Sequence, residues 1–320
     1  MIRRFVLAAA LGMAAPALAQ APAWPERPIR IVVPYGPGGG VDSFTRPIAA
    51  QLQGQLGQSV VVDNRAGAGG TIGVLNVARS PADGYTLLSG GVHQPMAEAL
   101  YPQRGYRIDA DFVPVAITAV VPNVLVVNPS SGLTDLRTLM DRARAAPGGL
   151  TYCSSGSGTS QHIIAEMFLR ETGLRMVHVP YRGTAPAMND LLAGVCPMMF
   201  DGMGTSAPQI QGQRLRPIAL TVARRSTLFP EIPTMAEAGG PGMDAGTWYA
   251  LWAPAGTPAP ILARLRAELR TALASPAVQR TWQQQGAEPS TIPEERLAEH
   301  VREEARRWSS LVTELGLRAE

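Results

Sequence analysis

The sequence predicts an α/β protein made of two doubly wound lobes joined by a two-strand hinge. Apolar strands alternate with helices along most of the chain, which is typical of largely parallel sheets. A strand followed by a glycine-rich turn and a helix start occurs at 29–42 and again at 150–162. Between them, the apolar runs 112–118 and 123–128 are separated at Pro122, which cannot donate to a sheet ladder. We interpret this break as the first passage between lobes.

The predicted parts of the chain are a signal peptide at 1–19, lobe 1 at 20–121 plus 224–320, and an inserted lobe 2 at 122–223. The leader combines Arg3-Arg4 with an apolar segment at 5–15 and Ala17-Leu18-Ala19 as the cleavage site. A membrane span needs about 20 apolar residues, and the leader's apolar segment is shorter. We therefore expect an exported protein, cleaved near Ala19.

Composition indicates a compact protein and argues against nucleic acid as a partner. Of the 320 residues, 46% are hydrophobic and 17% are charged, unlike a disordered chain. The formal charge of +3 includes Arg3 and Arg4, so removing them leaves +1. The chain contains no lysine, and its arginines are scattered rather than clustered.

The first glycine-rich turn is a candidate anion site. The run Ile29–Val33 predicts a buried strand, and after Pro34 four glycines occur within 36–40. Free N–H groups at a helix start favour an anion such as a carboxylate or phosphate; a plain turn remains the alternative. A dinucleotide fingerprint fails because its last glycine falls on Val41 or Ser43, and a P-loop fails for want of lysine.

The remaining lobe 1 segments continue the alternation. Strands are expected at 59–64 and 85–89, with a second glycine-rich turn and a helix at 65–79 between them. The aromatic run 246–254 predicts a strand of lobe 1, in which Trp248 and Tyr249 are either core residues or ligand contacts at the hinge. Two amphipathic helices, 260–274 and 293–315, are expected to follow.

Lobe 2 contains a second candidate anion site, again a strand followed by a glycine-rich turn and a helix start. The strand beginning at Leu150 leads into serines, glycines and a threonine, whose hydroxyl and N–H groups suit a carboxylate. Arg182 can pair with a ligand carboxylate or lie solvated in its loop. Asp201 ends a later strand at the same edge, where it can fix loop amides or waters, or receive a ligand ammonium group.

The two cysteines leave their pairing open. Export permits a disulfide between Cys153 and Cys196. If the strand ends align, however, the two residues are offset by about four positions, or roughly 13 Å, beyond the ~7 Å that a disulfide tolerates. The spacing therefore favours two free buried cysteines.

The sequence offers no catalytic or metal-binding motif, so we expect no enzyme and no cofactor. A G-x-S-x-G elbow is absent around Ser154, Ser155 and Ser157. The four histidines, 93, 162, 178 and 300, lack metal-ligand spacing.

The motifs resemble the Bug family, the periplasmic solute-binding receptors of tripartite tricarboxylate transporters. The resemblance covers the mature chain and rests on Pro34-Tyr35 with Pro37-Gly38-Gly39 and Asp42, on the 64–70 segment, on Asp83–Leu87, and on Val179–Gly183. It implies a periplasmic-binding-protein type II-like fold and a small carboxylate held largely by amides, hydroxyls and waters. The predicted ligand-binding residues are Tyr35, Pro37, Gly38, Gly39, Asp42, Ser89, Ser155, Gly156, Thr159, Ser160, Tyr181, Arg182, Gly183 and Asp201.

The resemblance also implies delivery of the carboxylate to the membrane subunits of such a transporter by a monomeric receptor in the periplasm. A sensing role beside a periplasmic sensor kinase is the first alternative, and a secreted carboxylate-processing enzyme is the second. Dicarboxylates, citrate-like acids, acidic amino acids and aromatic acids all fit a cradle of amides, so the identity of the ligand stays open.

Overall fold

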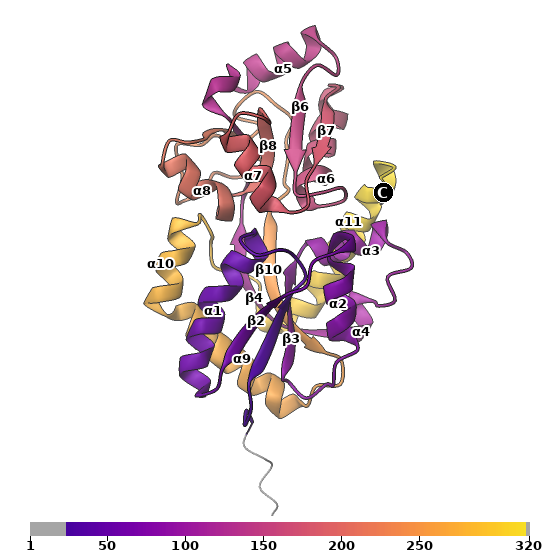
Figure 1. Ribbon diagram of the computed structural model, residues 1–320, viewed down its shortest axis with the longest axis vertical. Helices are drawn as coiled ribbons and strands as arrows, with labels where there is room; N and C mark the ends of the chain where they lie inside the picture. Colours follow the sequence, from indigo (N-terminus) through magenta and orange to yellow (C-terminus); the bar gives the residue numbers. More distant parts are fainter. Residues whose placement is uncertain (1–23, 318–320) are drawn as a thin grey trace, which may run out of the picture.

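The computed structural model describes residues 24–317, so the predicted signal peptide lies outside the described part of the chain. The described residues form two mixed sheets of five strands each, covered by helices (Figure 1). Lobe 1 is the part built around the sheet β2-β1-β3-β10-β4, and lobe 2 is the part built around β7-β6-β8-β5-β9. Within residues 24–317 no helix is long and apolar enough to cross a membrane.

The sheet of lobe 1 joins a parallel half to two antiparallel strands. Its strands are β1 (Ile29–Val33), β2 (Val60–Asn64), β3 (Thr86–Gly91), β4 (Phe112–Val121) and β10 (Thr247–Pro254). β1 pairs in parallel with both β2 and β3, whereas β10 lies antiparallel between β3 and β4. The buried, mostly β-branched sequence of β1 explains its central place, because both of its faces are covered.

The helices of lobe 1 include three that the sequence did not indicate, at 93–100, 108–111 and 276–284. They are α1 (Gly40–Leu56), α2 (Thr71–Ala78), α3 (His93–Leu100), α4 (Ile108–Asp111), α9 (Ala259–Ala274), α10 (Pro276–Gln284) and α11 (Leu297–Glu314). Pro95 is compatible with α3 because it lies in the first turn, where its missing N–H has no helical partner. Ser275 caps α10 by accepting from the Val278 N–H, with Pro276 at the first position.

Lobe 2 repeats the mixed arrangement with shorter strands. These are β5 (Asn123–Val127), β6 (Thr151–Ser154), β7 (Val177–Pro180), β8 (Met198–Gly202) and β9 (Arg216–Leu220). Its helices are α5 (Leu136–Ala145), α6 (Ser160–Thr172), α7 (Thr184–Leu192) and α8 (Met203–Gln211). Pro122 stands between β4 of the first sheet and β5 of the second, and the chain returns to the first sheet at β10.

The expectation of two free cysteines is wrong, because Cys153 and Cys196 form a disulfide with their Cα atoms 6.2 Å apart. Cys153 on β6 lies in register with Met199 on β8. Cys196 precedes β8 and lies in the turn after α7 rather than in an extended strand: its N–H donates to the carbonyl of Asp190, in the last turn of α7. The predicted separation assumed a straight strand through Cys196, and this turn shortens it.

Candidate functional site

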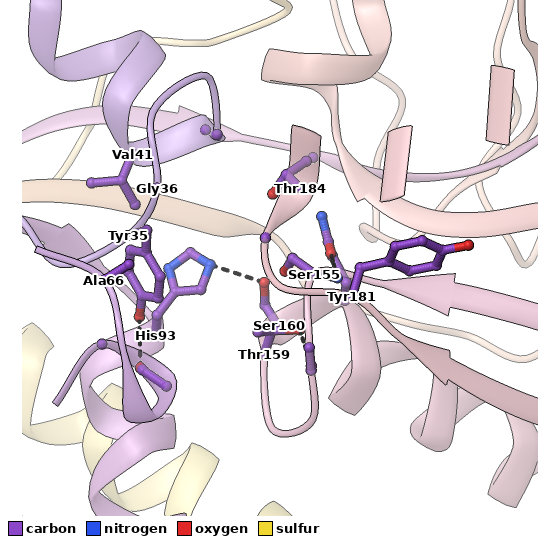
Figure 2. Close-up of a pocket in the computed structure, with 18 of the residues that line it drawn as sticks. Tyr35, Gly36, Val41, Ala66, His93, Ser155, Thr159, Ser160, Tyr181 and Thr184 are labelled. Carbon is purple, nitrogen blue, oxygen red and sulfur yellow. Dashed lines mark hydrogen bonds between the residues drawn. The ribbon is translucent and has the colours of Figure 1, made fainter. Parts of the chain in front are cut away.

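A cavity of about 770 Å³ lies where the loops of both lobes meet, and helices α1 and α6 both begin at it. Figure 2 shows the loops approaching from the two sides. The lining residues are Tyr35, Gly36, 39–41, 66–70, His93, Tyr101, Asn123, 155–157, 159–161, 180–184, Asp201, Gly202, Thr205, Thr247 and Tyr249. Their polar groups are mostly backbone amides and neutral hydroxyls.

The structure brings ten of the fourteen predicted site residues to this cavity. They are Tyr35, Gly39, Ser155, Gly156, Thr159, Ser160, Tyr181, Arg182, Gly183 and Asp201. Pro37, Gly38, Asp42 and Ser89 do not line it. Their direct contact with a ligand is therefore not supported by the geometry, and three of them have a different task in shaping the first loop.

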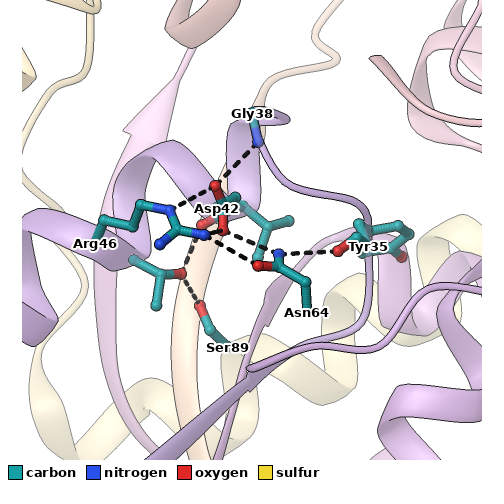
Figure 3. A network of polar contacts seen from close by, with 8 residues as sticks. Tyr35, Gly38, Asp42, Arg46, Asn64 and Ser89 are labelled. Atoms are coloured by element: carbon teal, nitrogen blue, oxygen red, sulfur yellow. Dashed lines mark hydrogen bonds and ion pairs between the residues drawn. The ribbon is translucent and has the colours of Figure 1, made fainter. Parts of the chain in front are cut away.

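Asp42 organises the first loop from behind (Figure 3). Its carboxylate accepts from Arg46 Nε at 2.8 Å, from the Gly38 N–H at 3.0 Å and from Asn64 Nδ2 at 2.9 Å. The same Asn64 amide group donates to the carbonyl of Tyr35. Burial acts to raise the pKa of Asp42, but these donors outweigh it and hold the pKa below its usual value. The loop, with Gly38 at a φ of +77°, is fixed by side chains that leave the cavity free.

Ser89 supports the start of α1. Its hydroxyl lies 2.6 Å from Thr45 Oγ1, which also donates to the carbonyl of Val41 in the first turn. Ser89 is buried on β3, beneath that turn. This contact holds the helix N-terminus in place against the sheet.

The second loop is held by a chain of neutral groups that ends on Asp201. Gln161 Oε1 accepts from the Ser155 N–H at 2.5 Å, and Gln161 Nε2 donates to Asp201 at 2.6 Å. Thr205 and Ser206 donate their hydroxyls to the other carboxylate oxygen. Burial raises the pKa of Asp201, while these hydrogen bonds oppose the rise. Asp201 therefore fixes loop groups, one of its two expected roles.

The third predicted loop, residues 181–183, presents backbone groups rather than a charged side chain to the centre of the cavity. The Gly183 N–H donates to the carbonyl of Ser155, which ties this loop to the second one. The Tyr181 hydroxyl donates to Asp190 at 2.6 Å. Arg182 is exposed at the cavity edge and makes no hydrogen bond or ion pair with another described residue.

The two lobes approach each other closely at two points of the cavity. His93 Nε2 lies 3.1 Å from Ser160 Oγ, as the dashed line in Figure 2 shows. A Cβ on Gly39 would stand 3.6 Å from Thr184 Oγ1. Burial lowers the pKa of His93 to about 4, so its ring is neutral at neutral pH. The lobes thus meet through neutral groups.

His93 and the turn 66–70 were not among the predicted site residues, although both line the cavity. The turn follows β2, which is parallel to β1, so the rule that carboxyl ends of parallel strands share one edge would have placed it there. His93 had no comparable signal, because α3 was not expected.

The cavity can hold a small anion without neutralising it by a buried cation. Helix N-termini and hydroxyls supply partial positive charge, and no group of metal-ligating side chains occurs among residues 24–317. Two lobes with one such cavity between them define the class of two-lobe solute-binding proteins. The comparisons with known proteins agree with this class.

The family described as "Tripartite tricarboxylate transporter family receptor" (TctC) matches residues 44–317. A UPF0065 protein of Pseudomonas sp. strain P51 is 41% identical over 298 residues, covering 93% of this chain and 89% of the relative. BugT of Bordetella pertussis is 39% identical over 313 residues, covering 97% and 95%. The chain belongs to the tripartite tricarboxylate transporter receptor family, which confirms the resemblance to Bug proteins.

Solved structures of binding proteins share the fold. The periplasmic binding protein BugD has a TM-score of 0.87 at 33% identity, covering 93% of this chain and all of that one. Rpa4515 of R. palustris with adipate has a TM-score of 0.87 at 36% identity, covering 92% and 99%. MatC of Rhodopseudomonas palustris with bound malate has 0.84 at 32%, covering 90% and 100%. Family and neighbours are binding proteins, as predicted, and not enzymes.

Proposed function

We propose that this protein captures a small carboxylate between its lobes in the periplasm and delivers it to the membrane subunits of a tripartite tricarboxylate transporter. The observation that carries the proposal is the convergence of two helix N-termini, those of α1 and α6, on one cavity of about 770 Å³. Each presents amides that have no partner within the helix. Solved relatives that hold adipate and malate support a carboxylate as the ligand.

The predicted lobes, 20–121 plus 224–320 and 122–223, would close on the ligand by a hinge motion. Gly39 of lobe 1 and Ser155 and Ser160 of lobe 2 all line the cavity, so the ligand would touch both lobes at once. A ligand bound in this way stabilises the closed form by its contacts to the second lobe.

The proposal is tested on the purified mature chain, starting at Gln20. Thermal unfolding is followed with succinate, malate, adipate, citrate, glutamate and benzoate, each in large excess. An acid present at 100 times its Kd adds about 2.7 kcal/mol to the free energy of unfolding. We expect at least one acid to stabilise the chain and none to be consumed; no stabilisation by any acid, or steady turnover, would contradict the binding role.

Delivery is tested separately, in cells that carry the matching membrane subunits. Uptake of the radiolabelled acid with the highest affinity should require this receptor and should stop when its gene is deleted. Unchanged uptake after deletion would contradict delivery while leaving binding intact.

A further inference from the structure

Tyr249 places a free hydroxyl at the cavity. The residue lies on β10 and is 5% exposed, yet its hydroxyl makes no hydrogen bond to another described residue. Of the other tyrosines at the cavity, Tyr35 donates to the carbonyl of Gly69 and Tyr181 to Asp190, whereas the Tyr101 hydroxyl, like that of Tyr249, makes no hydrogen bond to a described residue. Most buried polar groups have a partner. A partner from outside the protein would complete this one.

The hydroxyl lies between two glycines of opposite lobes. A methyl group on Gly40 would overlap it, and a Cβ on Gly202 would stand 3.9 Å from it. Both glycines line the cavity. Gly40 starts a right-handed helix and has no positive φ, so space, rather than backbone conformation, accounts for the glycine there. The Tyr249 hydroxyl therefore occupies the entrance to the first turn of α1.

The first turn of α1 has backbone N–H groups without a hydrogen-bond acceptor in the helix. The N–H groups of Gly40, Val41 and Asp42 have no acceptor inside the helix, and its N-cap, Gly39, carries no side chain to accept from them. An anion placed there would meet backbone donors on one side and the Tyr249 hydroxyl on the other.

Packing fixes the position of the hydroxyl. The Tyr249 ring stacks on Phe44 of α1 at 4.9 Å between centroids, and Phe44 meets the edge of Trp282 at 5.0 Å. The His93 ring also lies near-parallel to the Tyr249 ring, with the two centroids 6.2 Å apart. Burial, and secondarily the charge of Asp201, raise the pKa of Tyr249, so the hydroxyl stays a proton donor at neutral pH.

We propose that Tyr249 is a ligand-binding residue whose hydroxyl donates a hydrogen bond to the carboxylate held at the N-terminus of α1. This assignment rests on the proposed function and names a side chain that selects for an oxygen acceptor at that point. A hydroxyl that donates to water alone would contribute nothing to affinity.

The test compares Tyr249→Phe with wild type by calorimetric titration of the acid that gave the largest thermal shift among the six named above. Loss of one hydrogen bond to a charged acceptor should weaken binding about tenfold. The melting temperature without acid should stay as in wild type, because the hydroxyl has no protein partner to lose. Tyr85→Phe is the matched control, since its hydroxyl bonds the Glu26 N–H and Tyr85 does not line the cavity.

A second variant checks the geometry. Gly40→Ala should lower the melting temperature by forcing the ring aside, and Tyr249→Phe should restore part of the loss in the double variant. Wild-type affinity in Tyr249→Phe would overturn the inference alone. Failure of wild type to respond to any of the six acids would overturn the proposed function and this inference with it.

Discussion

The two loops that face each other across the cavity are built from different materials. The loop of lobe 1 is fixed by an ion pair, because Asp42 accepts from Arg46, Asn64 and Gly38 behind the turn. The loop of lobe 2 is fixed by the neutral Gln161, which links the Ser155 N–H to buried Asp201. Both loops leave helix N-termini open to the ligand. The same kind of binding surface is therefore held in place by an ion pair in lobe 1 and by a neutral amide side chain in lobe 2. The difference can be tested lobe by lobe.

The largest expected effect concerns the disulfide, which ties lobe 2 only. Replacing both Cys153 and Cys196 with alanine removes a link across 43 residues, worth about 4 kcal/mol by chain entropy. All five tryptophans lie in lobe 1, so tryptophan fluorescence follows that lobe, while far-ultraviolet circular dichroism follows both. We expect urea to unfold part of the dichroism signal before the fluorescence changes.

Wild type in dithiothreitol is the control and should match the double variant. Equal midpoints in both redox states would show that the disulfide does not stabilise lobe 2, and the proposed asymmetry of the lobes would fail.

The next effect concerns the closest approach of the two loops. Gly39→Val adds two methyl groups beyond a Cβ that already stands 3.6 Å from Thr184 Oγ1. Overpacking of this kind costs about 1–3 kcal/mol, so titration should show affinity reduced by up to about 100-fold. The φ of Gly39 is −81°, and folding should be unaffected.

Gly54→Val, within α1 and with open space around it, is the matched control. Unchanged affinity in Gly39→Val would mean that the ligand lies elsewhere.

A smaller effect separates the two carboxylates by pH. The pKa of Asp42 is lowered in the folded state, so its stabilisation is present above the unfolded pKa and is lost as pH falls through the folded pKa. Asp42→Asn should therefore lower the free energy of unfolding by about 1.5 kcal/mol at pH 7, discounted for the half-exposed Arg46. The difference should vanish in acid.

Asp201 should behave in the opposite sense. Because burial raises its pKa, any stability that it contributes is full below the unfolded pKa and is lost as pH rises through the folded pKa. Asp201→Asn should remove that loss between pH 3 and 7. Urea titrations across this range that show the same slope for both variants would refute the contrast.

The smallest effect concerns the exposed rim. Arg182→Ala should weaken binding of a dianion such as malate about threefold at low salt, since exposed ion pairs contribute below about 1 kcal/mol. Benzoate should bind as before, and added salt should erase the difference. Arg214→Ala, an exposed arginine of lobe 2 outside the cavity, serves as control. A loss of more than tenfold would move Arg182 into the ligand's direct contacts.

The sequence predicted the fold well because strand, turn and helix start are local signals. β1 with its glycine-rich exit and β6 with its serine-rich exit both lie where their composition indicated. It predicted side-chain direction poorly. Asp42 does not face the cavity because its carboxylate accepts hydrogen bonds from both Arg46 and Asn64. Asn64 lies at the end of β2, far from Asp42 in the sequence, so no local sequence signal indicated this contact. His93 and the disulfide depended on α3 and on the turn before β8, which have weak local signals.

The place of β10 in the first sheet imposes an order on assembly. This strand lies between β3 and β4, although it follows all of lobe 2 in the chain. Until β10 is synthesised, β3 and β4 therefore each have one edge without a hydrogen-bonded neighbour. Such unpaired edges can pair with other chains and cause aggregation. Lobe 2, whose strands are consecutive, can complete its sheet first. During synthesis, lobe 2 would thus fold completely before lobe 1.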